Sequence, residues 1–326
     1  MRRDDLDFLR CPRCGGKLLL AAGEERDGDI ECGAIRCSGC AGSFPIERHV
    51  ARFVPAESYA NSFGLQWNVF RKTQLDSTTG LPISRNRFFG ESGWIPEDLA
   101  GKRVLDVGCG AGRFSEIALA AGARLVSVDY SSAVDACMAN LGPHPRLTVL
   151  QADVYHLPFA PESFDYVYCF GVLQHTPDPR AALLALAPPL KRGGRLAFDF
   201  YRRMAANVLW TKYWLRPLTR RMKPETLFAI VQSVVPRLLP VSNALVAVPV
   251  LGPRLRYLLP VMNYRGVFPF SEEQHREWSI LDTYDMLAPA HDHPQNAQTV
   301  RGWVQESGLR EVDVCVEGLV VGRGVK

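Results

Sequence analysis

Residues 104–114 read VLDVGCGAGRF, an apolar run that ends in Asp106 and then carries three glycines at alternate positions. Glycines between a strand and a helix let the backbone adopt conformations closed to other residues and let a ligand approach the main chain. The helix that follows directs unpaired N–H groups into the same space. The spacing is G-x-G-x-G; a dinucleotide-binding turn would need a glycine where Arg113 stands, which weakens a pyrophosphate-binding interpretation. The pattern predicts a strand–turn–helix unit that holds a ligand at its glycines.

Strands and helices alternate after this turn. Residues 114–121 have helical spacing, and residues 124–131 form a β-branched run that reaches Asp129 about 20 residues after the glycines. An acid at the tip of the second strand is where a ribose is gripped through its hydroxyls. Further strands are predicted at 147–151, 164–170 and 195–201. This rhythm indicates a parallel, doubly wound sheet with a ligand crevice at the carboxyl ends of its strands.

Together these residues resemble the class I S-adenosylmethionine (SAM)-dependent methyltransferases, and in particular the type 11 family. The resemblance covers residues 104–200 and, in part, 280–326. It implies an α/β fold: a Rossmann-like, seven-stranded, doubly wound sheet whose last two strands form an antiparallel hairpin at 310–325. It also implies a SAM-binding set: Asp106, Gly108, Cys109, Gly110, Gly112, Asp129, Tyr130, Ala152, Asp153, Val154 and Phe170. Within this set, Asp153 would meet the adenine amino group, and Asp106 would either help hold the methionine end or cap the N–H groups of the turn.

Two polar loops supply candidates for catalysis and substrate contact. The segment LQH at 173–175 resembles the family's "L-x-H" loop and provides His175, and the stretch HDHPQ at 291–295 provides His291 and His293 for acid/base work. The second stretch could instead form a metal site, or its histidines could be ordinary hydrogen-bonding residues. Arg113 is expected to be solvated or paired. The substrate candidates are Gln66, Trp67, Gln74, Asp76, Gln174, Tyr264, Tyr284 and Asp292, with Asp282 and Asp285 competing for the same role.

Two C-x-x-C pairs stand near the N-terminus, Cys11 with Cys14 and Cys37 with Cys40. Two such dithiol turns can surround Zn²⁺ tetrahedrally in a closed, structural site. Cys32 is a fifth thiol nearby that could be a spare or could replace one ligand. Residues 7–54 resemble the small zinc ribbon found as a methyltransferase activator and fused in front of some bacterial methyltransferases. The metal would stabilise the fold and take no part in catalysis.

The segment from Arg202 to Arg256 carries ten Lys and Arg residues but one acid, Glu225, whereas the whole chain has a net charge of +4. Aromatic and apolar residues are interleaved with the basic ones, and seven prolines between positions 217 and 260 are expected to break this part of the chain into short helices. We interpret it as a substrate lid with a tendency to contact membrane surfaces. An RNA-binding face is the alternative. The longest uncharged run has two internal prolines and is shorter than the roughly 20 residues of a membrane span, so no transmembrane segment is expected.

These observations divide the chain into a zinc ribbon (1–54), a linker with helices that cover the cofactor site (55–100), a SAM-binding core (101–201), a helical lid insertion (202–277) and a C-terminal completion of the sheet (278–326). The first residues are charged and lack the apolar stretch of a secretory signal. Nine cysteines in this pattern suit a reducing compartment. We expect a cytoplasmic protein, with peripheral contact at the inner face of a membrane as an option.

The sequence therefore favours a SAM-dependent methyltransferase that acts by in-line displacement on a small-molecule, sugar or lipid-linked acceptor. The first alternative is an RNA base methyltransferase whose zinc ribbon binds RNA. The second is a non-catalytic SAM-binding subunit that acts on a partner protein. The acceptor, the methylated atom, the use of a general base and the oligomeric state are left open by the sequence.

Overall fold

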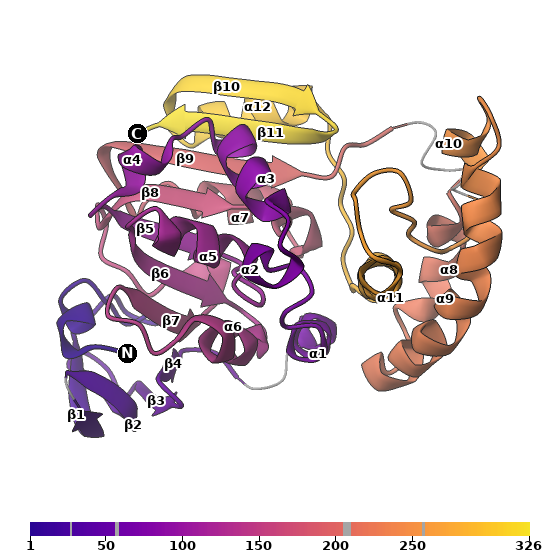
Figure 1. Ribbon diagram of the computed structural model, residues 1–326. Helices are drawn as coiled ribbons and strands as arrows, with labels where there is room; N and C mark the ends of the chain where they lie inside the picture. The colour runs from indigo at the N-terminus through magenta and orange to yellow at the C-terminus, as the bar shows by residue number, and fades with distance from the viewer. Residues whose placement is uncertain (27, 56–58, 205–209, 256–257) are drawn as a thin grey trace.

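The computed structural model describes residues 1–326 except 27, 56–58, 205–209 and 256–257 (Figure 1). The strands are β1 (Leu18–Arg26), β2 (Asp29–Cys37), β3 (Ser43–Glu47), β4 (Val50–Arg52), β5 (Arg103–Val107), β6 (Arg124–Asp129), β7 (Leu147–Gln151), β8 (Phe164–Cys169), β9 (Leu190–Phe200), β10 (Arg310–Glu317) and β11 (Leu319–Val325). The α-helices are α1 (Asn61–Val69), α2 (Asp76–Thr79), α3 (Ile83–Ser92), α4 (Pro96–Leu99), α5 (Arg113–Ala120), α6 (Ala133–Leu141), α7 (Pro179–Leu184), α8 (Thr211–Thr219), α9 (Pro224–Val246), α10 (Gly252–Leu255), α11 (Glu272–Leu287) and α12 (Ala297–Glu306). Short 3₁₀ helices occur at η1 (Arg3–Asp7), η2 (Val154–His156) and η3 (Leu173–His175).

The strands described form one sheet in the order β1-β2-β3-β4-β7-β6-β5-β8-β9-β11-β10. Strands β7, β6, β5, β8 and β9 are parallel, and β11 is antiparallel to both β9 and β10. These seven strands confirm the predicted doubly wound sheet with its terminal hairpin. Because β5 lies between β6 and β8, the chain crosses over in opposite directions from this point, and such a switch leaves a crevice at the carboxyl ends of the strands.

The sheet is longer than predicted because the N-terminal strands extend it beyond β7. Ala51 of β4 pairs in parallel with Leu150 of β7, and Arg52 pairs with Gln151. The Phe8 ring packs edge-on against Phe164 with 5.9 Å between the ring centroids. Pairing β4 with β7 satisfies main-chain groups that an edge strand would leave open. Residues 1–54 thus share both a sheet and a buried apolar cluster with the residues that follow.

Helices cover both faces of the parallel strands (Figure 1). Side chains of a strand alternate between the two faces, and in β5 Val104 packs with residues of α3, α5 and α6, whereas Leu105 packs with residues of α7 and α12. This two-sided burial explains why the strands of the core read as nearly continuous apolar runs. Phe88 of α3 lies within the first of these layers, so α3 belongs to the core even though it precedes the glycine turn.

Helices α8, α9, α10 and α11 form a separate layer beside the sheet, drawn in orange in Figure 1. Its core contains Leu227, Val231, Val235 and Leu239 of α9 together with residues of α11. The expectation that prolines break this segment into short helices is wrong for α9, which runs unbroken through Pro236 and Pro240. An interior proline costs about 3 kcal/mol, and a fully buried aliphatic side chain contributes about 1.5–3 kcal/mol. Packing of four such residues offsets the cost of the prolines.

At 23 residues, α9 has the length and composition of a helix that could cross a membrane. The prolines do not divide this helix, and Arg237 interrupts its uncharged sequence. One face of α9 is packed on α11 within the lid. Length and apolar composition alone are weak evidence for a span, since core helices of other proteins share them.

Phe88 tests whether α3 is part of the core. Its ring is fully buried and packs edge-on against Tyr168 and Trp94. Phe88→Ala is expected to lower the free energy of unfolding by about 3–5 kcal/mol, because it leaves a cavity in a close-packed layer. Urea denaturation measures this change. Ile95→Ala, at an exposed position shortly after α3, serves as control and should change the free energy of unfolding by less than about 0.5 kcal/mol. Equal changes in the two variants would contradict the placement of α3 in the core.

Candidate active site and candidate zinc centre

A cavity of about 810 Å³ lies at the carboxyl ends of the parallel strands. The loops after β5, β6, β7, β8 and β9 all contribute to its wall, and residues from α1, α3, α8 and α11 close it from the other side. From the predicted cofactor set, eight residues line it: Gly108, Cys109, Gly110, Asp129, Tyr130, Ala152, Val154 and Phe170. Asp106, Gly112 and Asp153 do not line it.

The glycine turn presents bare main chain to the cavity. Gly108 has φ of +85°, and an added Cβ would lie 2.2 Å from Cγ2 of Val172, so no other residue fits there. Gly110 has φ of +52°, and its Cβ position is 3.3 Å from the indole of Trp67. The turn is therefore enclosed by Val172 on one side and Trp67 on the other, with room for a ligand only against the backbone.

Asp129 ends β6 and is fixed by three donors. Its Oδ2 accepts the N–H of Gly110 at 3.0 Å, and its Oδ1 accepts the N–H and the hydroxyl of Ser131 at 2.8 and 2.7 Å. Burial raises the pKa of this carboxyl above its ordinary value, while these hydrogen bonds oppose the shift. A carboxylate has about four acceptor sites. Asp129 therefore keeps acceptor capacity toward hydroxyl groups of a ligand in the cavity.

Asp106 lies under α5 and away from the cavity. Its Oδ2 accepts the hydroxyl of Ser115 at 2.6 Å, and Ser115 in turn lies 3.0 Å from the hydroxyl of Ser127. Burial raises the pKa of Asp106 to about 7. The structure places this carboxyl in the interior of a strand–helix layer, where its hydrogen-bond donor is a side chain. Strand alternation places it on the opposite face from Leu105 and Val107.

Two other members of the predicted cofactor set also have local structural contacts. Gly112 precedes α5 and packs against α6, where an added Cβ would lie 2.7 Å from Leu141. The side chain of Asp153 accepts the N–H of Tyr155 at 3.0 Å and so caps η2. Cap geometry explains this orientation, because a short helix leaves its first N–H groups without main-chain partners.

His175 lines the cavity, and its two ring nitrogens differ in their hydrogen bonding. Its Nδ1 lies 3.1 Å from the carbonyl oxygen of His291. Because a carbonyl can only accept, Nδ1 carries the hydrogen and Nε2 carries a lone pair. Nε2 is buried and has no hydrogen-bond partner within the described part of the chain. The ring is held between Phe63 and Tyr201, with centroid distances of 5.2 and 5.3 Å.

The neighbouring candidates of these two loops are placed differently. His291 and His293 stack on each other at 5.7 Å and do not line the cavity, and Gln174 is fully buried beside them. Burial lowers the pKa of His291. Asp292 points the other way, lines the cavity and lies 3.1 Å from Nζ of Lys212. The alternation of this extended segment therefore separates Asp292 from the two histidines flanking it.

The substrate candidates fall into two groups. Trp67, Gln74, Tyr264 and Asp292 line the cavity, as do Asp282 and Asp285. The other four, Gln66, Asp76, Gln174 and Tyr284, do not line the cavity. Gln66 donates to Asp285 at 3.1 Å, and Asp76 accepts the N–H groups of Ser84 and Arg85 at the start of α3. Gln174 and Tyr284 are buried, the latter in the lid.

A buried polar group at the lid side of the cavity centres on Asp282. Its carboxylate accepts the hydroxyl of Tyr264 and, at 3.2 Å, the side-chain amide of Gln74. Burial raises the pKa of Asp282 to about 7. Arg113 donates to Gln74 at 2.9 Å and lies over the Trp278 ring at 5.6 Å. Of the two outcomes expected for Arg113, solvated or paired, the structure shows the paired one, and Trp278 of α11, which follows about 160 residues later, lies against it.

Sequence reasoning missed several residues of the cavity wall. Arg87, Tyr201, Lys212 and Arg216 all line it. The i, i+4 spacing of Lys212 and Arg216 with Thr219 was a usable signal, since it places three polar groups on one face of α8. The chemistry available at this end of the cavity is therefore that of paired acids and bases.

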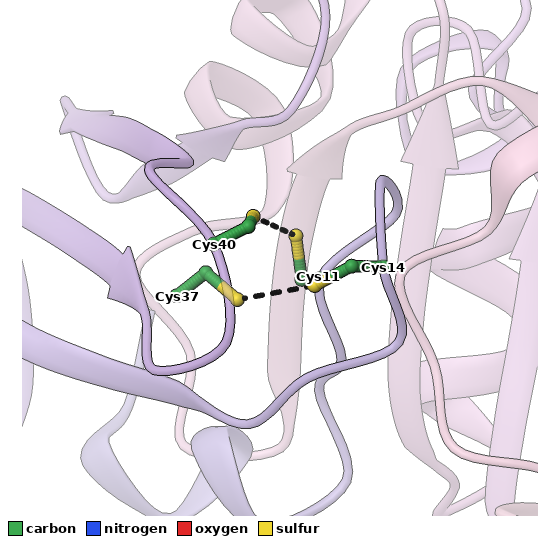
Figure 2. A group of neighbouring side chains, drawn as sticks. All are labelled: Cys11, Cys14, Cys37 and Cys40. Atoms are coloured by element: carbon green, nitrogen blue, oxygen red, sulfur yellow. Dashed lines mark hydrogen bonds between the residues drawn. The ribbon is translucent and has the colours of Figure 1, made fainter.

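Four cysteine sulfurs meet in the N-terminal region (Figure 2). The sulfurs of Cys11, Cys14, Cys37 and Cys40 all lie within 4.8 Å of one another, with 3.8 Å between Cys11 and Cys40 and 3.5 Å between Cys14 and Cys37. Tetrahedral Zn²⁺ with bonds of about 2.3 Å places its sulfurs roughly 3.8 Å apart. The cluster therefore fits a four-thiolate zinc site. Cys32 lies in β2 opposite Glu24 and is not part of it.

Residues 105–198 match the family model of the methyltransferase domain. This span contains the glycine turn, Asp129 and His175. Residues 105–198 are therefore similar to methyltransferase domains. The curated relatives of this domain include two ubiquinone biosynthesis O-methyltransferases. The protein of Stutzerimonas stutzeri (strain A1501) is 34% identical over 139 residues, covering 39% of this chain and 59% of the relative. That of Idiomarina loihiensis is 38% identical over 125 residues, covering 36% and 48%. The chain thus spans about half the length of these relatives.

Solved structures resemble the chain more distantly. A putative SAM-dependent methyltransferase from Methanococcus maripaludis has a TM-score of 0.45 at 13% identity and covers 84% of this chain and 96% of that one. Magnesium protoporphyrin IX methyltransferase from Synechocystis PCC 6803, solved with bound SAH, has a TM-score of 0.40 at 15% identity and covers 82% and 96%. No functional assignment rests on likenesses this weak.

The zinc centre predicts a metal content. Elemental analysis should find about one zinc per chain, and Cys40→Ser should lose the metal and lower the melting temperature, because a closed thiolate site contributes directly to folding. Cys32→Ser is the matched control, since it removes a nearby thiol from outside the cluster. Wild-type protein that is folded without zinc, or a Cys32→Ser variant that loses it, would contradict the assignment.

The Asp106 carboxyl predicts a pH dependence of stability. With an ordinary pKa of 3.8 and a folded-state pKa of about 7, Asp106 keeps its proton in the folded chain where the unfolded chain has released it. The free energy of unfolding therefore falls between about pH 4 and pH 7, by at most about 1.4 kcal/mol per pH unit. Asp106→Asn should reduce this fall by the share that Asp106 contributes and leave the share of Asp282, whose pKa is also raised to about 7, as measured by urea denaturation across the window. Asp4→Asn, at an exposed site, should leave the pH dependence of the free energy of unfolding unchanged. The same pH dependence in Asp106→Asn and wild type would contradict the raised pKa of Asp106.

Proposed function

We propose that this chain is a SAM-dependent methyltransferase that methylates a small-molecule, sugar or lipid-linked acceptor. The observation that carries the proposal is a single cavity with two unlike ends. We assign the donor to the part of the wall formed by the glycine turn and Asp129, and the acceptor to two polar pairs that line the same cavity, Asp282 with Tyr264 and Asp292 with Lys212. A donor and an acceptor can therefore occupy the cavity together. The relatives, which are O-methyltransferases of ubiquinone biosynthesis, support a small-molecule acceptor.

The donor end has the features that SAM requires. Gly108 and Gly110 leave the main chain accessible, and Asp129 has acceptor capacity for ribose hydroxyls. Tyr130, Ala152 and Phe170 supply a partly apolar wall for a flat base. When bound, SAM supplies a methyl carbon that its sulfonium makes electrophilic. The work left to the protein is chiefly to align the attacking atom with this carbon.

The acceptor end can orient a polar group. Asp282 is held by the Tyr264 hydroxyl and by Gln74, so its carboxyl has a fixed position. Because burial raises its pKa to about 7, this carboxyl can donate or accept a hydrogen bond near neutral pH. Trp278 and Phe268 flank it with aromatic surface. An acceptor that combines a ring or chain with a hydroxyl or amino group suits this end of the cavity.

His175 is the group best placed to take a proton from the acceptor. The His291 carbonyl fixes its tautomer, which leaves Nε2 as an acceptor at the cavity wall. The same carbonyl would stabilise the ring once it is protonated, because Nδ1–H remains its donor. His291 and His293 are not proposed for this step, since their rings do not line the cavity.

The direct test is transfer of label. The protein is incubated with methyl-labelled SAM and with mixtures of phenolic, sugar and lipid-linked acceptors, and the labelled product is isolated. Transfer to one of these classes is the expected result. Binding of SAM without transfer to any of them would contradict the proposed activity.

With the acceptor identified, His175→Gln should lower kcat by about 10²–10⁴-fold, the usual contribution of general-base catalysis. Its affinity for SAH should stay within about twofold, because Nε2 takes no part in the donor end. Calorimetry and steady-state kinetics separate the two effects. His156→Gln replaces an exposed histidine on η2 and serves as control. A His175→Gln variant with the kcat of wild type would contradict the role of His175 as general base.

A further inference from the structure

Helix α8 turns its polar side chains toward the protein and its apolar side chains toward solvent. Its buried face carries polar side chains, Lys212, Arg216 and Thr219. Its outer face carries Trp214 and Leu218, which are 67% and 66% exposed. A surface helix ordinarily packs its apolar face against the protein and turns its polar face to water. Here the arrangement is reversed.

Hydrogen bonds made by the buried face of α8 explain this orientation. The guanidinium of Arg216 donates to the carbonyls of Met286 and Pro289 at 3.1 and 2.9 Å, and the Thr219 hydroxyl donates to the carbonyl of Leu287 at 2.9 Å. These carbonyls lie at the C-terminal end of α11, where the last turn leaves acceptors without main-chain partners. Cations are also favoured at that end of a helix. The polar face of α8 is therefore fixed inward, and the apolar face is left outward.

Helix α9 also carries exposed apolar side chains. Ile230, Val234 and Val241 are exposed and follow one another at intervals of four and seven residues, which places them on one face of the helix. The buried stripe that packs on α11 occupies a different face. Val250, which follows α9, is 89% exposed. We call the exposed set Trp214, Leu218, Ile230, Val234, Val241 and Val250 the lid face.

Positive charge accompanies the lid face. Arg220, Arg221 and Lys223 are exposed in the turn that joins α8 to α9, and Arg237 is exposed between Val234 and Val241. From Thr211 to Gly252 the sequence contains one acid, Glu225. Apolar side chains together with basic ones at their edge are the combination that binds the interface of an anionic bilayer.

We propose that the lid face binds the surface of an anionic lipid bilayer, with its apolar side chains in the interface and its basic residues at the headgroups. A second copy of the chain is a poorer occupant, because a two-fold interface over this face would bring like charges together. An RNA partner would use the basic residues but would gain nothing from Ile230, Val234 and Val241. The charge and the aliphatic surface together favour lipid.

The position of α8 connects this surface to the cavity. Lys212 and Arg216 line the cavity from the inner face of the same helix whose outer face carries Trp214 and Leu218. An acceptor with a lipid tail could therefore have its head in the cavity while its tail stays in the bilayer. This consequence rests on the proposed function, whereas binding of the lid face to lipid does not.

The experiment is flotation of the full chain with vesicles of phosphatidylcholine alone or mixed equally with phosphatidylglycerol. Wild-type protein should bind the mixed vesicles, lose binding as salt is raised, and show a blue shift of tryptophan fluorescence. A variant with Leu218→Ser, Val234→Ser and Val241→Ser should bind about tenfold more weakly or less, and Arg221→Gln with Arg237→Gln should do the same. Leu19→Ser with Val316→Ser, at exposed apolar positions on β1 and β10, is the matched control and should bind as wild type.

Three results would overturn the proposal: failure of wild type to float with the mixed vesicles, unchanged binding of the lid-face variants, or a dimer in solution that the apolar variant dissociates. Calorimetric titration of each variant with SAH shows whether the fold and the donor end are intact. Vesicle binding and SAH binding are measured separately, so loss of one leaves the other interpretable.

Discussion

The ends of two neighbouring strands are held together by one carboxylate. Asp129 at the end of β6 accepts the N–H of Gly110 from the turn after β5 and two donors from Ser131. Glycines make this turn possible, but they also make it costly to order, because glycine loses the most conformational freedom on folding. The hydrogen bonds to Asp129, together with Val172 and Trp67 on either side, fix the turn in the form that a ligand meets. The donor end of the cavity depends on this arrangement.

The helices of the lid place polar side chains over the cavity. Helix α8 directs Lys212 and Arg216 inward, and the free carbonyls at the end of α11 give Arg216 its partners. Buried charges need such partners, since an unpaired charge inside a protein is strongly unfavourable. The consequence is an apolar outer face, so the site and the surface proposed to meet lipid are two sides of the same helix.

Local patterns predicted the parts of the fold that depend on local chemistry. The glycine spacing, the alternation of strands and helices and the C-x-x-C pairs led to the seven-stranded sheet and the cysteine cluster, because each depends on residues close together in sequence. The groups that surround Arg113 could not be predicted, because Trp278 and Asp282 lie on a distant helix. The contacts of Asp106 with Ser115 could not be predicted, because a motif does not say which face of a strand an acid occupies. Helix α9 was divided in prediction because the local cost of proline was not weighed against the burial of its apolar stripe.

We infer that the turn around Gly110, held by Asp129, binds the amino-acid and sugar ends of SAM. Calorimetric titration with SAH tests it most directly, using wild type, Asp129→Ala and, as a carboxylate control outside the cavity, Asp106→Asn. About one SAH per chain is expected for wild type and Asp106→Asn, and at least about tenfold weaker binding for Asp129→Ala, since hydrogen bonds to a charged group contribute about 1.5–3 kcal/mol. Equal affinity of Asp129→Ala and wild type, or no binding by folded wild type, would contradict it.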